Sequence, residues 1–176
     1  KSGIPGKLFS KTKYGDEYMK EKENLHMIGV GPVIVGVQLL ITAVGIFLSC
    51  CGYFDFGKAE QIQIPLIIIG IAIIILGIFL WLCANFKSNI DDGITNNRLV
   101  TTGIYAWVRN PIYSAFFFLC IGAVFIADNL LLLIILVINW AYMTIFLKLT
   151  EEKWLYNQYG KEYADYCKRV NRCIPW

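Results

Sequence analysis

The chain has 176 residues, of which 57% are hydrophobic and only 16% are charged. Soluble globular domains carry about 25% charged residues, so this composition excludes an ordinary water-soluble domain and indicates a protein that folds in a bilayer. The formal net charge of +3 is small and scattered, which argues against a nucleic-acid partner, and the length suits a single domain.

Residues 1–26 are polar and rich in charges of both signs, and no apolar period organises them. We expect this segment to lie at a membrane surface. It contains no short apolar core followed by a small-residue cleavage site, so no removable signal peptide is predicted.

Two apolar runs without a charged residue follow, at about 27–54 and at 62–86. Each exceeds the ~20 residues that a helix needs to cross a hydrocarbon layer of ~30 Å. The sequence therefore predicts two transmembrane helices, joined by a short loop at 57–61 into an antiparallel hairpin. Gly70 and Gly77 are seven residues apart, so we expect them to share one closely packed helix face.

A third apolar stretch, 114–147, is interrupted once by Asp128-Asn129. A charged, turn-favouring pair at this point is typical of the tip of a second helical hairpin. Asp128 as an intramembrane acid in a proton path is the alternative interpretation. The first arm, 114–127, is short for a full crossing, so it is tilted little, begins earlier near Pro111 or does not reach full depth. The predicted fold is an all-α integral membrane protein with four to five transmembrane helices.

Lysine and arginine placement predicts the orientation, because cytoplasmic loops retain positive charge. Fifteen of the sixteen lie in residues 1–26, in 87–111 and in the tail from Lys148, whereas the opposite loops contain only Lys58. Both termini are thus predicted to be cytoplasmic. The chain divides into a polar cytoplasmic segment at 1–26, a transmembrane hairpin at 27–86, and a region at 87–176. This last region contains the second hairpin, 114–147, and its segment 87–111 and its tail are predicted to face the cytoplasm.

Six cysteines occur, and four of them lie in or beside apolar runs: Cys50, Cys51, Cys83, Cys120, Cys167 and Cys173. No CxxC pair or histidine-rich spacing is present, and His26 is the only histidine. We therefore expect the thiols to pack as small hydrophobic groups, and no metal site is predicted.

Two segments carry an unusual variety of side chains. Residues 97–113 include aromatic residues and two arginines, which on composition alone suit an interfacial loop. In the tail 150–166, a stripe at helical spacing begins at Glu151 and ends at Tyr166, unless Gly160 breaks the helix. The adjacent Glu151 and Glu152, taken alone, suit solvated charges at headgroup level.

Together the two segments resemble the isoprenylcysteine carboxyl methyltransferase family and the phospholipid methyltransferases related to it. The resemblance runs from about Arg98 to Arg172 and is carried, in order, by Leu99-Val100, Gly103, Tyr105, Arg109, Pro111, Tyr113, Glu151-Glu152, Gly160, Glu162-Tyr163, Tyr166, Arg169 and Val170. It implies a cytoplasmic C-terminal catalytic subdomain that binds S-adenosyl-L-methionine, releases S-adenosyl-L-homocysteine, and methylates a lipidic acceptor at the membrane interface, most similarly to carboxyl O-methylation of isoprenylcysteine.

Three positions depart from the family pattern. Asn110 stands where histidine is usual, and Asn171 stands where proline is common. The arginine that precedes the glutamate pair in eukaryotic relatives is not evident, and Lys148 is the nearest preceding cation. Because asparagine donates and accepts hydrogen bonds but does not titrate, cofactor binding tolerates this change better than a role that requires a proton.

The chemistry suits such a site. Methyl transfer from a sulfonium is an in-line displacement, so the protein mainly aligns donor and acceptor and excludes water. By resemblance the cofactor pocket comprises Arg98, Leu99, Val100, Tyr105, Asn110, Pro111, Tyr113, Glu151 and Glu152. One glutamate, with Glu152 favoured, would hold the ribose or amine. The candidate catalytic residues are Arg109, Arg169 and Glu152; the arginines pair with the cofactor carboxylate or the acceptor, or anchor the surface.

Other functions remain open at this point. The acceptor is an isoprenylcysteine carboxylate, a phospholipid amine or another small lipid. More distantly, the segment from Gly160 to Val170 is similar to the end of NADPH-dependent sterol reductases. A non-enzymatic protein with four spans is a third class. The sequence does not give an oligomeric state, and the lipid bilayer is the one partner common to all these interpretations.

Overall fold

The computed structural model describes residues 13–86 and 98–174, and their regular elements are all helical. The α-helices are α1 (Lys13–Cys50), α2 (Gln63–Phe86), α4 (Pro111–Ile126), α5 (Leu133–Leu149), α6 (Glu151–Tyr159) and α7 (Lys161–Arg169). Short 3-10 turns lie between them: η1 (Asp55–Gly57), η2 (Glu60–Ile62), η3 (Gly103–Ala106) and η4 (Leu130–Leu132). The predicted all-α class is confirmed.

Within the described residues, three helical stretches are long and apolar enough to cross a membrane. They are Val30–Cys50, Glu60–Asn85 and Leu130–Tyr159. Helix α4 is also apolar but has only 16 residues, a rise of about 24 Å. Large apolar side chains on α2, such as Ile64, Ile68 and Ile75, are exposed, which suits a helix surface solvated by lipid. The chain is therefore a membrane protein.

The chain divides into two units, Lys1–Val33 and Ile34–Trp176. In the first unit, helix α1 already begins at Lys13, within the segment that the sequence predicted only as a polar surface stretch. In the second unit, α1 ends at Cys50 rather than near Phe54. Gly52 follows with a φ of +87°, a conformation that glycine adopts without strain, and the connection to α2 is therefore longer than the predicted loop.

The turn between α4 and α5 lies at the predicted pair. Asp128 has a φ of +51°, which ends the helical path. Asn129 fixes the turn: its Oδ1 accepts from Leu131 N at 3.0 Å, and its Nδ2 donates to Ser49 Oγ at 2.7 Å and to the Phe54 carbonyl at 2.9 Å. The predicted hairpin tip is confirmed, and the same amide attaches this tip to the end of α1.

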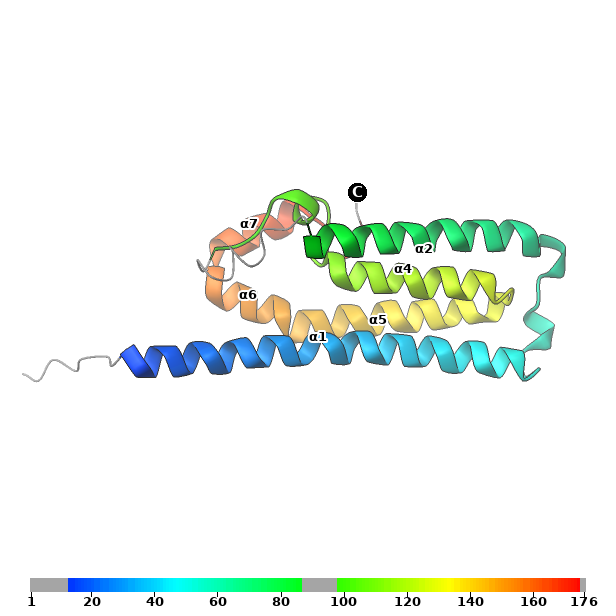
Figure 1. Cartoon of the computed structure of the whole chain (residues 1–176), viewed down its shortest axis with the longest axis horizontal. Helices are drawn as coiled ribbons and strands as arrows, with labels where there is room; N and C mark the ends of the chain where they lie inside the picture. Colours follow the sequence, from blue (N-terminus) through cyan, green and yellow to red (C-terminus); the bar gives the residue numbers. More distant parts are fainter. Residues whose placement is uncertain (1–12, 87–97, 175–176) are drawn as a thin grey trace, which may run out of the picture. The chain divides into compact units, whose positions relative to one another are not determined.

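Helices α2 and α4 lie side by side (Figure 1) and approach closely at small residues. A Cβ built on Gly70 would lie 2.8 Å from the Gly122 carbonyl, and one on Gly77 would lie 2.9 Å from the Ala115 carbonyl. Any larger side chain at these positions would force the backbones apart. The prediction that Gly70 and Gly77 share a packed face is confirmed, and α4 is the helix on which they pack.

Buried amides join α1 to α5. Asn139 Nδ2 donates to Thr42 Oγ1 at 2.8 Å and to the Gln38 carbonyl at 3.4 Å, while Gln38 Nε2 contacts Met143 Sδ at 3.6 Å. Interhelical hydrogen bonds of this kind contribute about 0.6 kcal/mol each in a membrane protein. They fix α5, which in turn places α6 at its C-terminal end.

Candidate functional site

The chain bends at Thr150 before α6. Its backbone angles, φ −112° and ψ −85°, are not helical, and its Oγ1 donates to the Phe146 carbonyl at 2.7 Å. Helix α6 therefore starts anew with Glu151 and Glu152 in its first turn, where carboxylates are favoured by the helix dipole. Gly160, with a φ of +50°, separates α6 from α7 and interrupts the stripe that the sequence predicted.

The loop before α4 pairs with the C-terminal segment. Val108 and Asn171 form an isolated parallel bridge. The Arg109 amide donates to the Asn171 carbonyl at 2.9 Å, and the Asn110 amide donates to the Arg172 carbonyl at 3.0 Å. The two segments that carry the family resemblance are thus brought together at one end of the α4–α5 hairpin.

Glu152 lies between two arginines. Arg172 Nε and Nη2 donate to its two carboxylate oxygens at 2.6 and 2.8 Å, a bidentate ion pair, and Arg109 Nη1 lies 3.2 Å from Oε1. The three side chains are largely buried, with exposed fractions of 13% for Glu152, 9% for Arg109 and 20% for Arg172. Two cations face one anion here, so this group of three carries a net charge of +1.

Glu151 has a different environment. The Tyr113 hydroxyl donates to Glu151 Oε1. Tyr113 is buried in the first turn of α4, two residues after Pro111, whose missing amide hydrogen costs little at a helix start. Since Tyr113 engages one oxygen, the second carboxylate oxygen of Glu151 remains available as an acceptor within this part of the structure.

Arg109 also contacts α7. Its Nη1 donates to the Tyr163 hydroxyl at 3.3 Å and to Cys167 Sγ, and its guanidinium lies 5.9 Å from the centroid of the Tyr163 ring. Arg109 Nε is buried and has no hydrogen-bond acceptor among the residues that the structure describes. A buried donor without an acceptor is costly, so this atom marks a place where a ligand acceptor would be stabilised.

The tyrosines around the cluster are neutral donors. Burial raises the pKa values of Tyr105, Tyr163 and Tyr166 well above the ordinary range, so all three phenols keep their protons at neutral pH. The Tyr166 hydroxyl donates to the Tyr105 carbonyl at 2.6 Å and ties α7 to η3. Burial also raises the pKa of Cys173 to about 12, which makes this thiol a poor nucleophile.

Most of the predicted site residues gather in this cluster: Tyr105, Arg109, Asn110, Pro111, Tyr113, Glu151 and Glu152. Arg98, Leu99 and Val100 lie in the preceding stretch, and among the described residues the hydrogen bonds and ion pairs of the glutamate pair go to Tyr113, Arg109 and Arg172 instead. Arg169 is exposed and its Nε donates to the Asp165 carbonyl of its own helix, so the structure does not bring it to Glu152.

The sequence interpretation missed Arg172 and the role of α7. Tyr163 was noted only in the stripe and among the residues of the family resemblance, and Cys167 only as a small hydrophobic thiol, yet both contact Arg109. Arg172 was passed over because it follows the end of α7 and lies twenty positions from Glu152. The sequence offered one signal: no arginine precedes the glutamate pair, so a cationic partner for Glu152 had to come from another part of the chain.

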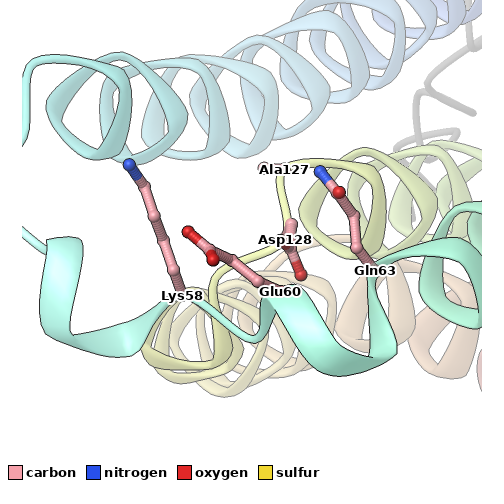
Figure 2. Close-up of a pocket in the computed structure, with 5 residues that line it drawn as sticks. All are labelled: Lys58, Glu60, Gln63, Ala127 and Asp128. Carbon is pink, nitrogen blue, oxygen red and sulfur yellow. The ribbon is translucent and has the colours of Figure 1, made fainter.

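A polar hollow lies at the end of α4 opposite to the arginine–glutamate cluster (Figure 2). It has a volume of about 320 Å³ and is lined by Lys58, Glu60, Gln63, Ala127 and Asp128. Asp128 is at the turn rather than along a helix, and Lys58 is paired with Asp55 at 2.7 Å. Because α4 rises about 24 Å between the two ends, this hollow is separate from the arginine–glutamate cluster.

Asn110 is expected to tolerate histidine. Its side chain is 8% exposed, and its Nδ2 donates to the Arg172 carbonyl at 3.3 Å, a contact that a neutral imidazole N–H also makes. In the cofactor pocket that the family resemblance implies, Asn110→His should therefore keep the affinity for S-adenosylhomocysteine within about tenfold, or roughly 1.4 kcal/mol. Isothermal titration of the detergent-purified variant checks this, and complete loss of binding by a folded protein would contradict it.

A sequence model of the phospholipid methyltransferase family matches residues 61–162, more than half of the chain. The protein-S-isoprenylcysteine O-methyltransferase of Saccharomyces cerevisiae is 35% identical over 83 residues, covering 47% of this chain and 34% of the yeast protein. The Xenopus laevis protein of that name is 29% identical over 118 residues, covering 62% of this chain and 40% of its own length. The Homo sapiens protein is 31% identical over 117 residues, covering 61% and 40%.

The chain thus spans less than half of the length of these relatives. No solved structure matches it. The family match includes α2, the α4–α5 hairpin, α6 and the beginning of α7, and so covers the elements that carry Arg109 and the glutamate pair. The chain therefore belongs to the phospholipid methyltransferase family, and its resemblance to the isoprenylcysteine carboxyl methyltransferases is confirmed.

Proposed function

We propose that the chain is a membrane-embedded methyltransferase that transfers a methyl group from S-adenosylmethionine to the carboxylate of an isoprenylcysteine. The observation that carries this proposal is the cluster in which Arg109 and Arg172 face Glu152 beside the Tyr113–Glu151 pair. The matching relatives from Saccharomyces cerevisiae, Xenopus laevis and Homo sapiens are named protein-S-isoprenylcysteine O-methyltransferases, which supports the choice of acceptor.

The residues present fit the methyl donor. Arg109 Nε is a buried donor in need of an acceptor, which a carboxylate supplies, and the second oxygen of Glu151 is an acceptor suited to an ammonium or a ribose hydroxyl. The ring of Tyr163, already near a guanidinium, offers an aromatic face that favours cations. When bound, S-adenosylmethionine supplies an activated methyl group on a positively charged sulfur.

The chain's own residues have a limited task. An isoprenylcysteine carboxylate is already ionised at neutral pH, so no base has to remove a proton. Arg109 and Arg172 carry one positive charge more than Glu152 neutralises, and the buried Arg109 Nε lacks an acceptor among the described residues, so an anionic acceptor is favoured beside Arg109. Glu151, whose carboxylate accepts from Tyr113, adds a negative charge to the site. Tyr113 and Asn110 are both buried beside the cluster, and a site from which water is limited strengthens these charge interactions.

The unpaired donor of Arg109 separates the two acceptor classes. A phospholipid amine that receives a methyl group must reach the donor as a neutral amine, whereas a carboxylate arrives with the charge that the arginines stabilise. Burial keeps the neighbouring phenols of Tyr163 and Tyr166 protonated, so neither is poised to take a proton from an amine at neutral pH. We therefore propose carboxyl rather than amine methylation.

Two measurements test the function. Isothermal titration of the detergent-purified chain should show binding of S-adenosylhomocysteine and no binding of NADPH. The reductase alternative requires that NADPH binds. Radiolabelled S-adenosylmethionine should then transfer its methyl group to a farnesylcysteine analogue and not to phosphatidylethanolamine, the product ester being recognised by release of methanol in base. Transfer to phosphatidylethanolamine alone would establish the amine alternative, and absence of binding to S-adenosylhomocysteine would contradict a methyltransferase.

The orientation that follows is multi-pass, with both termini and the cluster on the cytoplasmic side. It is supported by fifteen of sixteen basic residues falling on that side and only Lys58 on the other. Lys58 is exposed beside η2, at the opposite end of α4 from the cluster. A Lys58→Cys variant, with the native cysteines replaced by serine, should react with a membrane-impermeant maleimide only from the non-cytoplasmic side. Labelling only from the cytoplasm would reverse the orientation.

A further inference from the structure

Arg172 lies in the short segment that follows α7. Helix α7 ends at Arg169, and Val170 has extended backbone angles, φ −125° and ψ 132°, so the chain leaves the helical path here. This change of direction carries residues 171–173 alongside the loop at 108–110, where the parallel bridge and two backbone hydrogen bonds hold them. The position of Arg172 is therefore set by backbone pairing and not by a helix face.

The side chain of Arg172 determines how Glu152 is oriented. Its Nε and Nη2 engage the two carboxylate oxygens at 2.6 and 2.8 Å, so the carboxylate cannot rotate without losing a hydrogen bond. The planar fork of arginine matches a carboxylate in this way, whereas a lysine ammonium makes only point contacts. Arg172 and Glu152 are both largely buried. The hydrogen bond from Arg172 to Glu152 raises the pKa of Arg172, so this arginine stays charged.

The backbone of Arg172 makes a second attachment. Its carbonyl accepts from the Asn110 amide at 3.0 Å and from Asn110 Nδ2 at 3.3 Å. One residue thus joins the loop before α4 to the first turn of α6. Because Arg109 is the neighbour of Asn110 and also pairs with Glu152, the two arginines are held on the same carboxylate from two different segments.

Arg109 alone leaves the carboxylate free to turn. Its single contact to Glu152 Oε1 is 3.2 Å long, and the same Nη1 also faces Tyr163 and Cys167. The nearest cation before the glutamate pair, Lys148, is exposed near the end of α5. Within the described residues, Arg172 is the side chain that engages both oxygens of Glu152.

We propose that Arg172 is a positioning residue, which fixes Glu152 and through it aims Arg109 at the ligand. This inference rests on the proposed function, since it assigns how the methyltransferase site is held in shape before donor and acceptor bind. It predicts that Arg172 acts through Glu152 and contributes little once Glu152 is changed.

The test compares Arg172→Gln and Arg172→Lys with Lys168→Gln, a matched loss of a basic side chain that is 75% exposed. Affinity for S-adenosylhomocysteine is measured by titration, and kcat and KM are measured with the farnesylcysteine analogue. We expect Arg172→Gln to lose at least about tenfold in kcat and in S-adenosylhomocysteine affinity, Arg172→Lys to recover part of both, and Lys168→Gln to match the wild type.

A double variant separates positioning from mere support of the fold. Arg172→Gln combined with Glu152→Gln should be no weaker in S-adenosylhomocysteine binding than Glu152→Gln alone, because the route through Glu152 is already broken. Thermal unfolding of the ligand-free variants reports folding, and Arg172→Lys serves if Arg172→Gln does not fold.

The outcomes remain distinguishable. Wild-type affinity and kcat in a folded Arg172→Gln, or in Arg172→Lys where the glutamine variant does not fold, would overturn the proposal while leaving the methyltransferase intact. Equal, additive losses from Arg172 and Glu152 substitutions would also overturn it. A wild-type chain that does not bind S-adenosylhomocysteine would contradict the proposed function itself, and with it this role for Arg172.

Discussion

Replacing Glu152 with glutamine is expected to weaken S-adenosylhomocysteine binding about tenfold to more than a hundredfold. Glutamine removes the negative charge shared by Arg109 and Arg172, and its amide group turns donors toward guanidinium donors. Loss of a charge-assisted contact in a site screened from water costs about 1.5–3 kcal/mol, and the two unpaired cations would rearrange.

Glu151→Gln should have a smaller effect, about tenfold. The glutamine carbonyl still accepts from the Tyr113 hydroxyl, so only the second, unengaged oxygen changes character. Glu162→Gln on α7 is the control, since Glu162 is exposed and should show no change.

Titration of the three variants with S-adenosylhomocysteine ranks the effects. Near-wild-type affinity in both Glu151→Gln and Glu152→Gln would mean that the pair acts only as solvated charges at a helix start. This result would remove the main physical support for the proposed site. A larger loss in Glu151→Gln than in Glu152→Gln would mean that the contact of Glu151 with the ligand contributes more to binding than the ion pairs of Glu152 with the two arginines.

The fold was predictable at positions where a residue pattern in an apolar segment indicates a single structural feature. A charged pair inside an apolar run marks a turn, and Asp128-Asn129 forms one. Glycines seven apart mark a close helix contact, and Gly70 and Gly77 make it with α4. Which helix receives that contact was not predictable, because apolar faces in lipid do not identify their partners.

The site was predictable only as two segments. Family resemblance placed Arg109 and the glutamate pair in one region, and the structure brings them within an ion-pair distance of 3.2 Å. The resemblance also gave Arg169 as a candidate and not Arg172, three residues later, although Arg169 lies on the exposed side of α7 and Arg172 is the residue that pairs with Glu152. Sequence spacing does not distinguish these two, because the chain leaves the helix at Val170 and the pairing with residues 108–110 is tertiary.

Arg109→Met is expected to reduce kcat/KM for the isoprenylcysteine analogue by about a hundredfold or more. The substitution keeps a similar volume but removes the cation that contacts Glu152, Tyr163 and Cys167 and the buried Nε that lacks an acceptor. Arg109→Lys should recover little, because a lysine ammonium does not reproduce a guanidinium with donors facing two directions.

The matched control is Arg169→Met, which removes an arginine from the surface of α7, where its Nε reaches only the Asp165 carbonyl. We expect its kcat/KM to stay within about twofold of the wild type, as for surface substitutions that change the free energy by less than about 0.5 kcal/mol. Rates with radiolabelled S-adenosylmethionine and the farnesylcysteine analogue check both variants. Equal losses in the two variants would mean that Arg169 also reaches the ligand, as the family resemblance implies. A loss only in Arg169→Met would place the acceptor site on the exposed side of α7 rather than on the side that faces Arg109.

A loss confined to Arg109→Met would keep Arg109 in the site. If KM for the acceptor rises by a larger factor than the affinity for S-adenosylhomocysteine falls, this arginine binds the acceptor carboxylate rather than the methyl donor.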